Sequence, residues 1–314
     1  MEQRNFFKKT LFWIPATLIG ILLIIACYLA YVYVPPEDRE YKSPYLESID
    51  SDFLNTDEFI IHYTQAGEGD PVLLIHGSCA WMYSFRHNMP ALAKNFSVYA
   101  LDMPGNGYTV TICNDAKYDL NMMSKALLNF LDNKQIKKAS LVGHSSGGGW
   151  ILHFADIYPE RVKKLVLIDS NGFDIPEKLV FRLFYIPVIG ELFSKFFTYS
   201  DVKQGCEDGF YNKSLVTDKV VQETMTPLTF SNNRKAQYLS IRNQDWGITE
   251  LAMPQIKIPT LVIWGEYDQY LDVSLANRFK KTMPNAEVVI IDKCGHSAHE
   301  EHPGKVNKLI SEFL

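Results

Sequence analysis

The stretch from 137 to 150 constrains this chain more than any other, because it predicts a strand, a tight turn and a helix in immediate succession. The apolar run from Ala139 to Val142 has the length of a buried strand, and an apolar-periodic segment that contains Trp150 follows the run Gly-His-Ser-Ser-Gly at 143–147. Glycines on both sides of Ser145 allow a sharp turn that lifts the serine hydroxyl above the sheet edge. The pattern predicts Ser145 as a nucleophile, and a glycine-rich turn without chemistry is the alternative.

Apolar segments of strand length alternate with helical patterns from Phe59 to the C-terminus. These segments begin near 59, 72, 98, 141, 165, 261 and 288, and they are rich in Val, Ile and Leu. Such an alternation is typical of an α/β fold, with a mostly parallel central sheet and helices on both faces. Functional residues are then expected after the carboxyl ends of the strands. At 314 residues and 47% hydrophobic composition, the chain can bury a sizeable core.

An acid and a histidine follow two of these strands. Asp268 comes after the strand that begins at 261, and His296 comes after the strand that begins at 288. An imidazole can take the proton of a serine hydroxyl, and a carboxylate on its other nitrogen fixes the tautomer. Glu266 and Asp169 are alternative candidates for the acid.

These motifs, in this order, resemble the α/β-hydrolase fold family over roughly 59–314. The matching segments are His76-Gly77, Asp102 to Gly107, Gly143 to Gly148, Trp264 to Asp268, and Gly295-His296 with Glu301 and Pro303. The resemblance implies that Ser145 is the nucleophile, Asp268 the acid and His296 the base. It also implies an oxyanion hole from the backbone N–H groups of Ser78 and Ser146, and no cofactor.

A long insertion separates two of the predicted strands. About 90 residues lie between Asp169 and Thr260, more than a crossover helix needs. The excess predicts a helical cap at 173–246, inserted between core segments at 49–172 and 247–314. Its segment 179–197 is richly apolar. That composition favours a hydrophobic substrate, although these residues could instead only pack the cap onto the sheet.

The N-terminal region differs in kind from the rest of the chain. After a tail at 1–10, the 24 positions from 11 to 34 carry no charge, enough at about 1.5 Å per residue to cross a bilayer core of roughly 30 Å. We therefore expect a transmembrane helix over 11–34, followed by a polar linker at 35–48. Basic residues before the run and acidic residues after it predict a single-pass protein with an extracytoplasmic catalytic domain. A lipoprotein signal at Cys27 and a cleaved signal peptide are the alternatives.

Several function classes are disfavoured. The net charge is −5 and no basic stripe is present, so a nucleic-acid partner is not expected. His296, His299 and His302 recur every third residue, which is not the spacing of a metalloprotease helix, so no metal is expected. Four cysteines follow the N-terminal segment and allow three disulfide pairings: Cys79, Cys113, Cys206 and Cys294. The sequence leaves the oligomeric state open.

The sequence therefore predicts a membrane-anchored serine hydrolase that cleaves small carboxylic esters, with a preference for hydrophobic ones, through an acyl-enzyme. Three alternatives use the same residues: a carbon–carbon bond hydrolase of diketone-like substrates, an amide or prolyl-peptide hydrolase, and a perhydrolase. A fourth, of a different class, is a catalytically inactive binding protein on the same scaffold.

Overall fold

The computed structural model describes the backbone of residues 2–176, 182–186, 188–196 and 198–314, and the side chains within these ranges from Thr17 onward except at 183. Its described strands form one sheet in the order β1-β2-β4-β3-β6-β7-β8-β9, with β5 paired to β2. The strands are β1 (Ser51–Asn55), β2 (Phe59–Ala66), β3 (Pro71–Ile75), β4 (Ser97–Leu101), β5 (Val110–Thr111), β6 (Ala139–His144), β7 (Val162–Ile168), β8 (Thr260–Gly265) and β9 (Ala286–Ile291).

The sheet is parallel from β4 to β9 and antiparallel at the β1–β2 edge. Every residue of β6 and β8 is buried, which explains their runs of Val, Leu and Ile. The predicted α/β class with a mostly parallel central sheet is confirmed.

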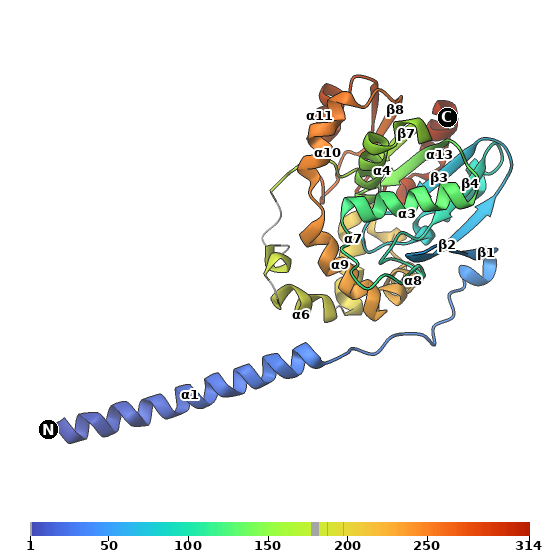
Figure 1. Ribbon diagram of the computed structural model, residues 1–314. Coiled ribbons are helices and arrows are strands. Elements are labelled where there is room, and N and C mark those ends of the chain that lie inside the picture. Colours follow the sequence, from blue (N-terminus) through green and yellow to red (C-terminus); the bar gives the residue numbers. More distant parts are fainter. Residues whose placement is uncertain (1, 177–181, 187, 197) are drawn as a thin grey trace.

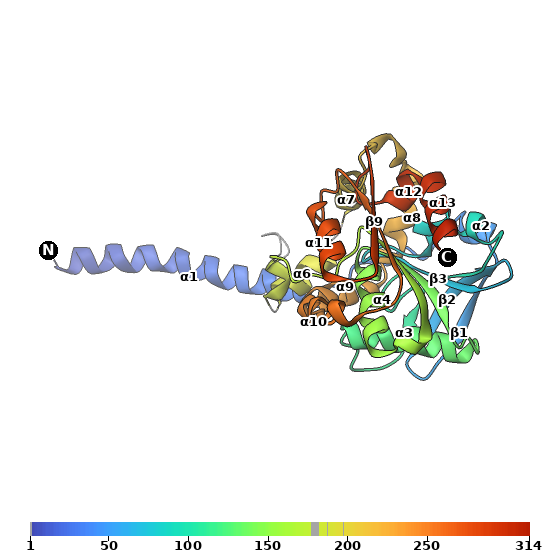
Figure 2. The same cartoon turned by 90° about the horizontal axis from the view of Figure 1, so that it is seen from above.

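Helices cover both faces of this sheet (Figures 1 and 2). On one face, Phe130, Trp150 and Phe279 belong to the same buried apolar cluster, and they come from α3 (Leu120–Asn133), α4 (Ser146–Ile157) and α11 (Ser274–Thr282). On the other face, Leu92 and Val306 pack from α2 (Met89–Leu92) and α13 (Pro303–Phe313). Shorter helical turns are η1 (Leu46–Ser48), η2 (Met82–Phe85), η3 (Pro159–Arg161), η6 (Met253–Gln255) and α12 (Ala298–Glu301).

Helices also fill the insertion between β7 and β8. They are η4 (Leu183–Tyr185), α6 (Ile189–Lys195), α7 (Tyr199–Gly209), η5 (Lys213–Leu215), α8 (Asp218–Leu228), α9 (Ser231–Asn243) and α10 (Trp246–Ala252). Thr198 begins α7 with a capping box, and Thr217 caps α8 through a hydrogen bond from the Val220 N–H. The insertion has a small apolar core of its own: Val202, Phe210, Val216, Val221 and Leu228.

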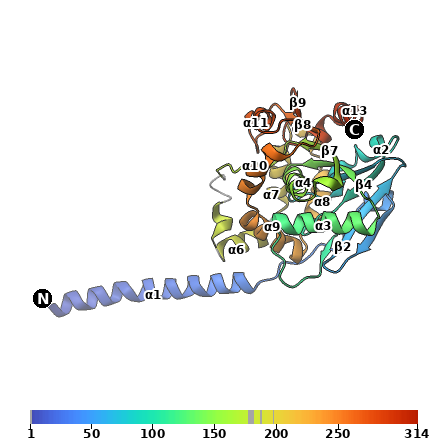
Figure 3. The same ribbon diagram turned by 45° about the horizontal axis from the view of Figure 1, so that its top comes forward.

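The N-terminal helix α1 (Glu2–Val32) extends away from the body of the protein as an isolated rod (Figures 1 and 3). Near its end, Tyr33 stacks on Phe196 of the insertion with ring centroids 6.1 Å apart, and Lys195 hydrogen-bonds the Tyr31 carbonyl. The prediction of a membrane-spanning helix over 11–34 is wrong. In the part of the chain that the structure describes, no helix has both the length and the apolar character that crossing a bilayer requires.

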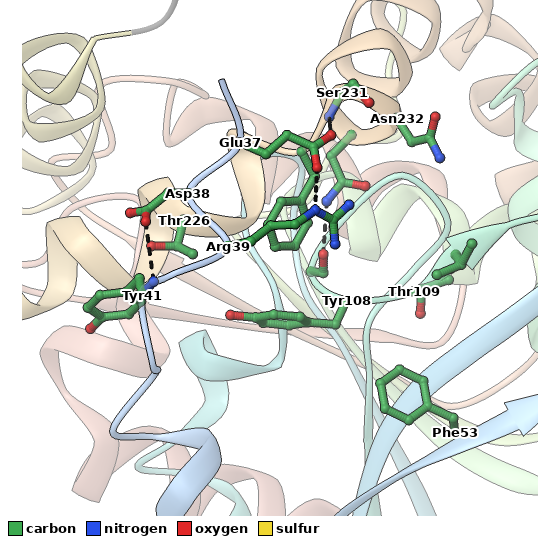
Figure 4. Close-up of a pocket in the computed structure, with 14 residues that line it drawn as sticks. Glu37, Asp38, Arg39, Tyr41, Phe53, Tyr108, Thr109, Thr226, Ser231 and Asn232 are labelled. Carbon is green, nitrogen blue, oxygen red and sulfur yellow. Dashed lines mark hydrogen bonds and ion pairs between the residues drawn. The ribbon is translucent and has the colours of Figure 1, made fainter. Parts of the chain in front are cut away.

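The segment at 35–48, predicted as a linker, lies against the insertion. The Glu223 carboxylate of α8 accepts hydrogen bonds from Ser43 Oγ at 2.6 Å and from the Tyr45 N–H at 3.2 Å, and all three residues are buried. Glu37 accepts a hydrogen bond from the Ser231 N–H at 2.8 Å. A hollow of about 340 Å³ opens between this segment, β1 and α9, and Figure 4 shows its polar and aromatic lining.

Candidate active site

Ser145 occupies the strained turn between β6 and α4. Its backbone has φ 52° and ψ −122°, a region that non-glycine residues rarely adopt. The turn is held by hydrogen bonds from the Ser145 N–H to the Ile168 carbonyl at 2.9 Å and from the Asn171 N–H to the Ser145 carbonyl at 3.0 Å. A side chain at Gly147 would place Cβ 2.3 Å from the His76 carbonyl oxygen, so this position requires glycine.

Asp268 and His296 are brought together from the ends of β8 and β9. His296 Nδ1 lies 2.8 Å from Asp268 Oδ2, and the carboxylate side chain is completely buried. Asp268 Oδ1 accepts the N–H groups of Tyr270 and Leu271 at 2.8 and 2.9 Å. Because an ionised carboxylate only accepts, His296 carries its proton on Nδ1 and leaves the lone pair on Nε2. Ser145 and His296 line the same pocket.

The two competing acids are placed elsewhere. Asp169 is fully buried, and its two oxygens accept the N–H groups of Gly265 at 2.7 Å and Ala298 at 3.3 Å. Burial, reinforced by the nearby charge of Asp268, raises the pKa of Asp169 well above its usual value. Glu266 is exposed, and its pKa is raised mainly by a hydrogen bond with Asp292. Of the three acids that the sequence singled out, Asp268 is the one in contact with His296.

The two backbone donors predicted for an oxyanion hole flank Ser145. Ser146 is the first residue of α4, whose N-terminus carries a partial positive charge. Ser78 follows β3, and its hydroxyl donates to Ser146 Oγ at 2.9 Å, while Asn171 Nδ2 donates to the same oxygen at 3.1 Å. Within the described part of the chain, the main-chain N–H groups of Ser78 and Ser146 have no hydrogen-bond partner.

A pocket of about 510 Å³ lies between the core and the insertion, with Ser145 and His296 in its wall. Sequence reasoning missed several of its residues, because they approach Ser145 only when separate segments fold together. Gln237 of α9, for example, accepts the Cys79 N–H at 3.2 Å and donates to the Gly105 carbonyl at 3.0 Å. Other lining residues that the sequence did not single out are Asn171, Gln244, Trp246 and Glu300.

The described part of the apolar segment 179–197 does not line this pocket. Residues 179–181, 187 and 197 lie outside the described residues, and none of the described remainder lines the pocket. Several of its side chains are exposed instead: Tyr185, Ile186, Val188, Ile189, Phe193 and Phe196.

The three C-terminal histidines face different surroundings. His299 is fully buried against the ring of Phe85, whereas His302 is partly exposed and its Nε2 lies 3.1 Å from the Lys293 carbonyl oxygen. The five cysteines are free thiols, so none of the disulfide pairings that the sequence allows is formed in this structure.

Comparison with known families agrees with this geometry. The model of the alpha/beta hydrolase fold family matches residues 70–198 and 212–303. The chain belongs to the α/β-hydrolase fold family.

The chain is similar to three known proteins over nearly the full length of each. A 2-hydroxy-6-oxononadienedioate/2-hydroxy-6-oxononatrienedioate hydrolase from Comamonas testosteroni is 29% identical over 85% of this chain and 97% of its own. A solved meta-cleavage product hydrolase from Pseudomonas fluorescens is 26% identical with a TM-score of 0.73, over 85% of this chain and 98% of its own. A solved bacterial membrane phospholipase A is 25% identical with a TM-score of 0.70, over 96% of this chain and 92% of its own.

These findings correct the main functional prediction. The curated relatives with 26–31% identity include several hydrolases named for 2-hydroxy-6-oxo acids rather than for esters. The described residues contain no helix able to cross a membrane. The prediction of a membrane-anchored ester hydrolase with an extracytoplasmic catalytic domain is therefore wrong, and the findings favour the carbon–carbon bond alternative.

Proposed function

We propose that the chain hydrolyses a carbon–carbon bond beside a ketone in a small 2-hydroxy-6-oxo dienoic acid or a closely similar diketone-like compound. The observation that carries this proposal is the likeness to the dienedioate hydrolase, which extends over 85% of this chain and 97% of that relative. The pocket of about 510 Å³ beside Ser145 supports it, because its volume suits a small organic acid.

Ser145 is the proposed nucleophile. His296 Nε2 takes the serine proton as the hydroxyl attacks the ketone, and Asp268, 2.8 Å from Nδ1, stabilises the imidazolium that forms. The free N–H groups of Ser78 and Ser146 would bind the oxyanion. Donors of this kind contribute about 3–4 kcal/mol each in enzymes where they have been removed.

The bond to carbon breaks only if the departing carbon can hold an electron pair. In the keto tautomer of a 2-hydroxy-6-oxo dienoic acid, a double bond conjugates the released carbon with the 2-oxo group. The electron pair therefore moves to that oxygen, which takes the proton from the His296 imidazolium to give a 2-hydroxy diene and leaves His296 neutral. His296 then activates a water molecule, whose hydroxyl adds to the acyl-Ser145 carbonyl and releases a carboxylic acid.

A rate comparison tests the proposal. The purified chain would be given a 2-hydroxy-6-oxo dienoic acid and, separately, a nitrophenyl ester of the acid that it would release, with Ser145→Ala as the control. The loss of the visible dienolate absorbance measures turnover of the dienoic acid, and mass spectrometry identifies both fragments. We expect kcat/KM for the dienoic acid to exceed kcat/KM for the ester. Turnover of the ester with the dienoic acid left intact would overturn the proposal.

A further inference from the structure

His144 lies directly before Ser145, yet its side chain contacts the segment that carries His296. The imidazole is buried, and its Nε2 lies 2.9 Å from the His296 carbonyl oxygen, across 152 positions of sequence. A carbonyl only accepts, so Nε2 carries the proton of this neutral ring. The other nitrogen, Nδ1, is buried and has no hydrogen-bond partner among the described residues. The hydrogen bond therefore fixes both the tautomer and the orientation of His144.

The same ring lies close to His296, to His299 and to the loop that leads into Ser78. Its centroid lies 4.9 Å from the His296 ring and 4.4 Å from the His299 ring. Its Nδ1 lies 3.2 Å from the point that a Cβ on Gly77 would occupy, directly before Ser78. His144 is thus wedged between the turn of the nucleophile, the loop of the histidine and the loop of the second backbone donor.

The ring remains uncharged in this position. Burial, together with the neighbouring imidazoles of His299 and His296, lowers the pKa of His144 well below its usual value. A neutral ring whose only N–H is already used cannot serve as a general acid, and the lowered pKa makes its free Nδ1 a weak base. Although the ring also borders the pocket, the one hydrogen bond that its side chain makes among the described residues goes to the backbone of His296.

We propose that His144 is a positioning residue that holds the main chain of His296 against the turn of Ser145. The inference rests on the proposed roles of Ser145 and His296, but not on the identity of the bond they cleave. Ser145 and His296 come from distant strands, and a misplacement of about 1 Å between reacting groups can lower a rate about 100-fold. One hydrogen bond from the residue next to the nucleophile limits that movement.

The chain offers a matched control in His299. This residue is fully buried and its ring packs at a tilt against His144, but neither of its ring nitrogens has a partner among the described residues. Replacing His299 with Phe keeps an aromatic ring against His144 and removes no side-chain hydrogen bond to a described residue. The variant therefore distinguishes the effect of ring packing from the effect of the hydrogen bond that His144 makes.

The test compares His144→Phe, His144→Gln, His144→Asn and His299→Phe. A Gln amide nitrogen reaches the position of Nε2 and can donate to the His296 carbonyl, whereas an Asn amide is too short. Each variant would be assayed for the rate of Ser145 labelling by a fluorophosphonate, and for kcat and KM on whichever substrate the wild type turns over. Labelling reports the reactivity of Ser145 even if the carbon–carbon bond proposal fails.

We expect His144→Phe and His144→Asn to lower both the labelling rate and kcat by about 10- to 100-fold, with KM unchanged. His144→Gln should return both within about threefold of wild type, and His299→Phe should leave both unchanged. If His144→Phe does not fold, the comparison of Asn with Gln decides. Equal rates for Asn and Gln, or an equal loss in His144→Phe and His299→Phe, would overturn the inference.

Discussion

Replacing Asp268 with Asn should almost abolish activity without unfolding the protein. Asp268 Oδ1 accepts two N–H groups at 2.8 and 2.9 Å, so an Asn would keep its oxygen there and turn its amide nitrogen toward His296. The Asn N–H would then force His296 Nδ1 to accept, which moves the imidazole proton to Nε2. An imidazole protonated on Nε2 cannot take the proton of Ser145. The same substitution in a measured serine triad lowers kcat about 10⁴-fold, or about 5.4 kcal/mol of activation free energy.

Asp169→Asn is the matched control, because this carboxylate is equally buried but contacts two backbone N–H groups rather than His296. The Asn amide would leave one of those donors unpaired, at a cost of about 1–3 kcal/mol in the free energy of unfolding. We expect kcat to change less than about tenfold.

The assay is steady-state kcat at neutral pH for both variants, alongside thermal unfolding to show that each is folded. A larger loss of kcat in Asp169→Asn than in Asp268→Asn would refute the reasoning and assign the acid to Asp169.

Three further predictions concern Glu223 of the insertion, Gly149 of α4 and the buried His299. Glu223→Gln should lower the free energy of unfolding by about 1–3 kcal/mol in urea titrations, because an amide cannot accept both hydrogen bonds from the 35–48 segment. Gly149→Ala would place Cβ 2.2 Å from the Trp246 ring, so the free energy of unfolding should fall by about 1–3 kcal/mol in thermal unfolding experiments. The displaced Trp246 lines the pocket, so KM should rise. Burial lowers the pKa of His299 to about 3, so between about pH 6.5 and pH 3 the unfolded chain binds a proton that the folded chain does not. The free energy of unfolding should therefore fall as the pH is lowered through this range. Urea titrations at stepped pH should show a shallower fall in His299→Phe.

The core of the fold could be predicted because its determinants are local. The buried strands β6 and β8 are continuous apolar runs, and the glycines around Ser145 are required by close backbone contacts that leave a clear mark on the sequence. The lining from the insertion could not be predicted in this way. Gln237 and Asn171 reach the pocket only through docking of α9 and of the loop after β7, and no local pattern records that docking.

The N-terminal prediction failed for a different reason. It rested on the count of uncharged positions from 11 to 34, and the absence of charge alone does not establish a membrane span. In the described residues no helix has both the length and the apolar character that a span requires. Similarly, the apolar composition of 179–197 suggested a hydrophobic pocket, but composition does not say which way a helix faces. Phe193 and Phe196 of that segment are exposed.

The central claim is that Ser145 takes up the acyl half of a substrate whose carbon–carbon bond has broken. It is tested most directly by mixing the chain with a 2-hydroxy-6-oxo dienoic acid, quenching within a single turnover, and mapping the peptides by mass spectrometry. The account predicts an acyl adduct on the peptide that contains Ser145, formed together with one equivalent of the 2-hydroxy diene and absent from Ser145→Ala. Release of the diene while Ser145 stays unmodified, or an intact dienoic acid beside rapid ester cleavage, would contradict it.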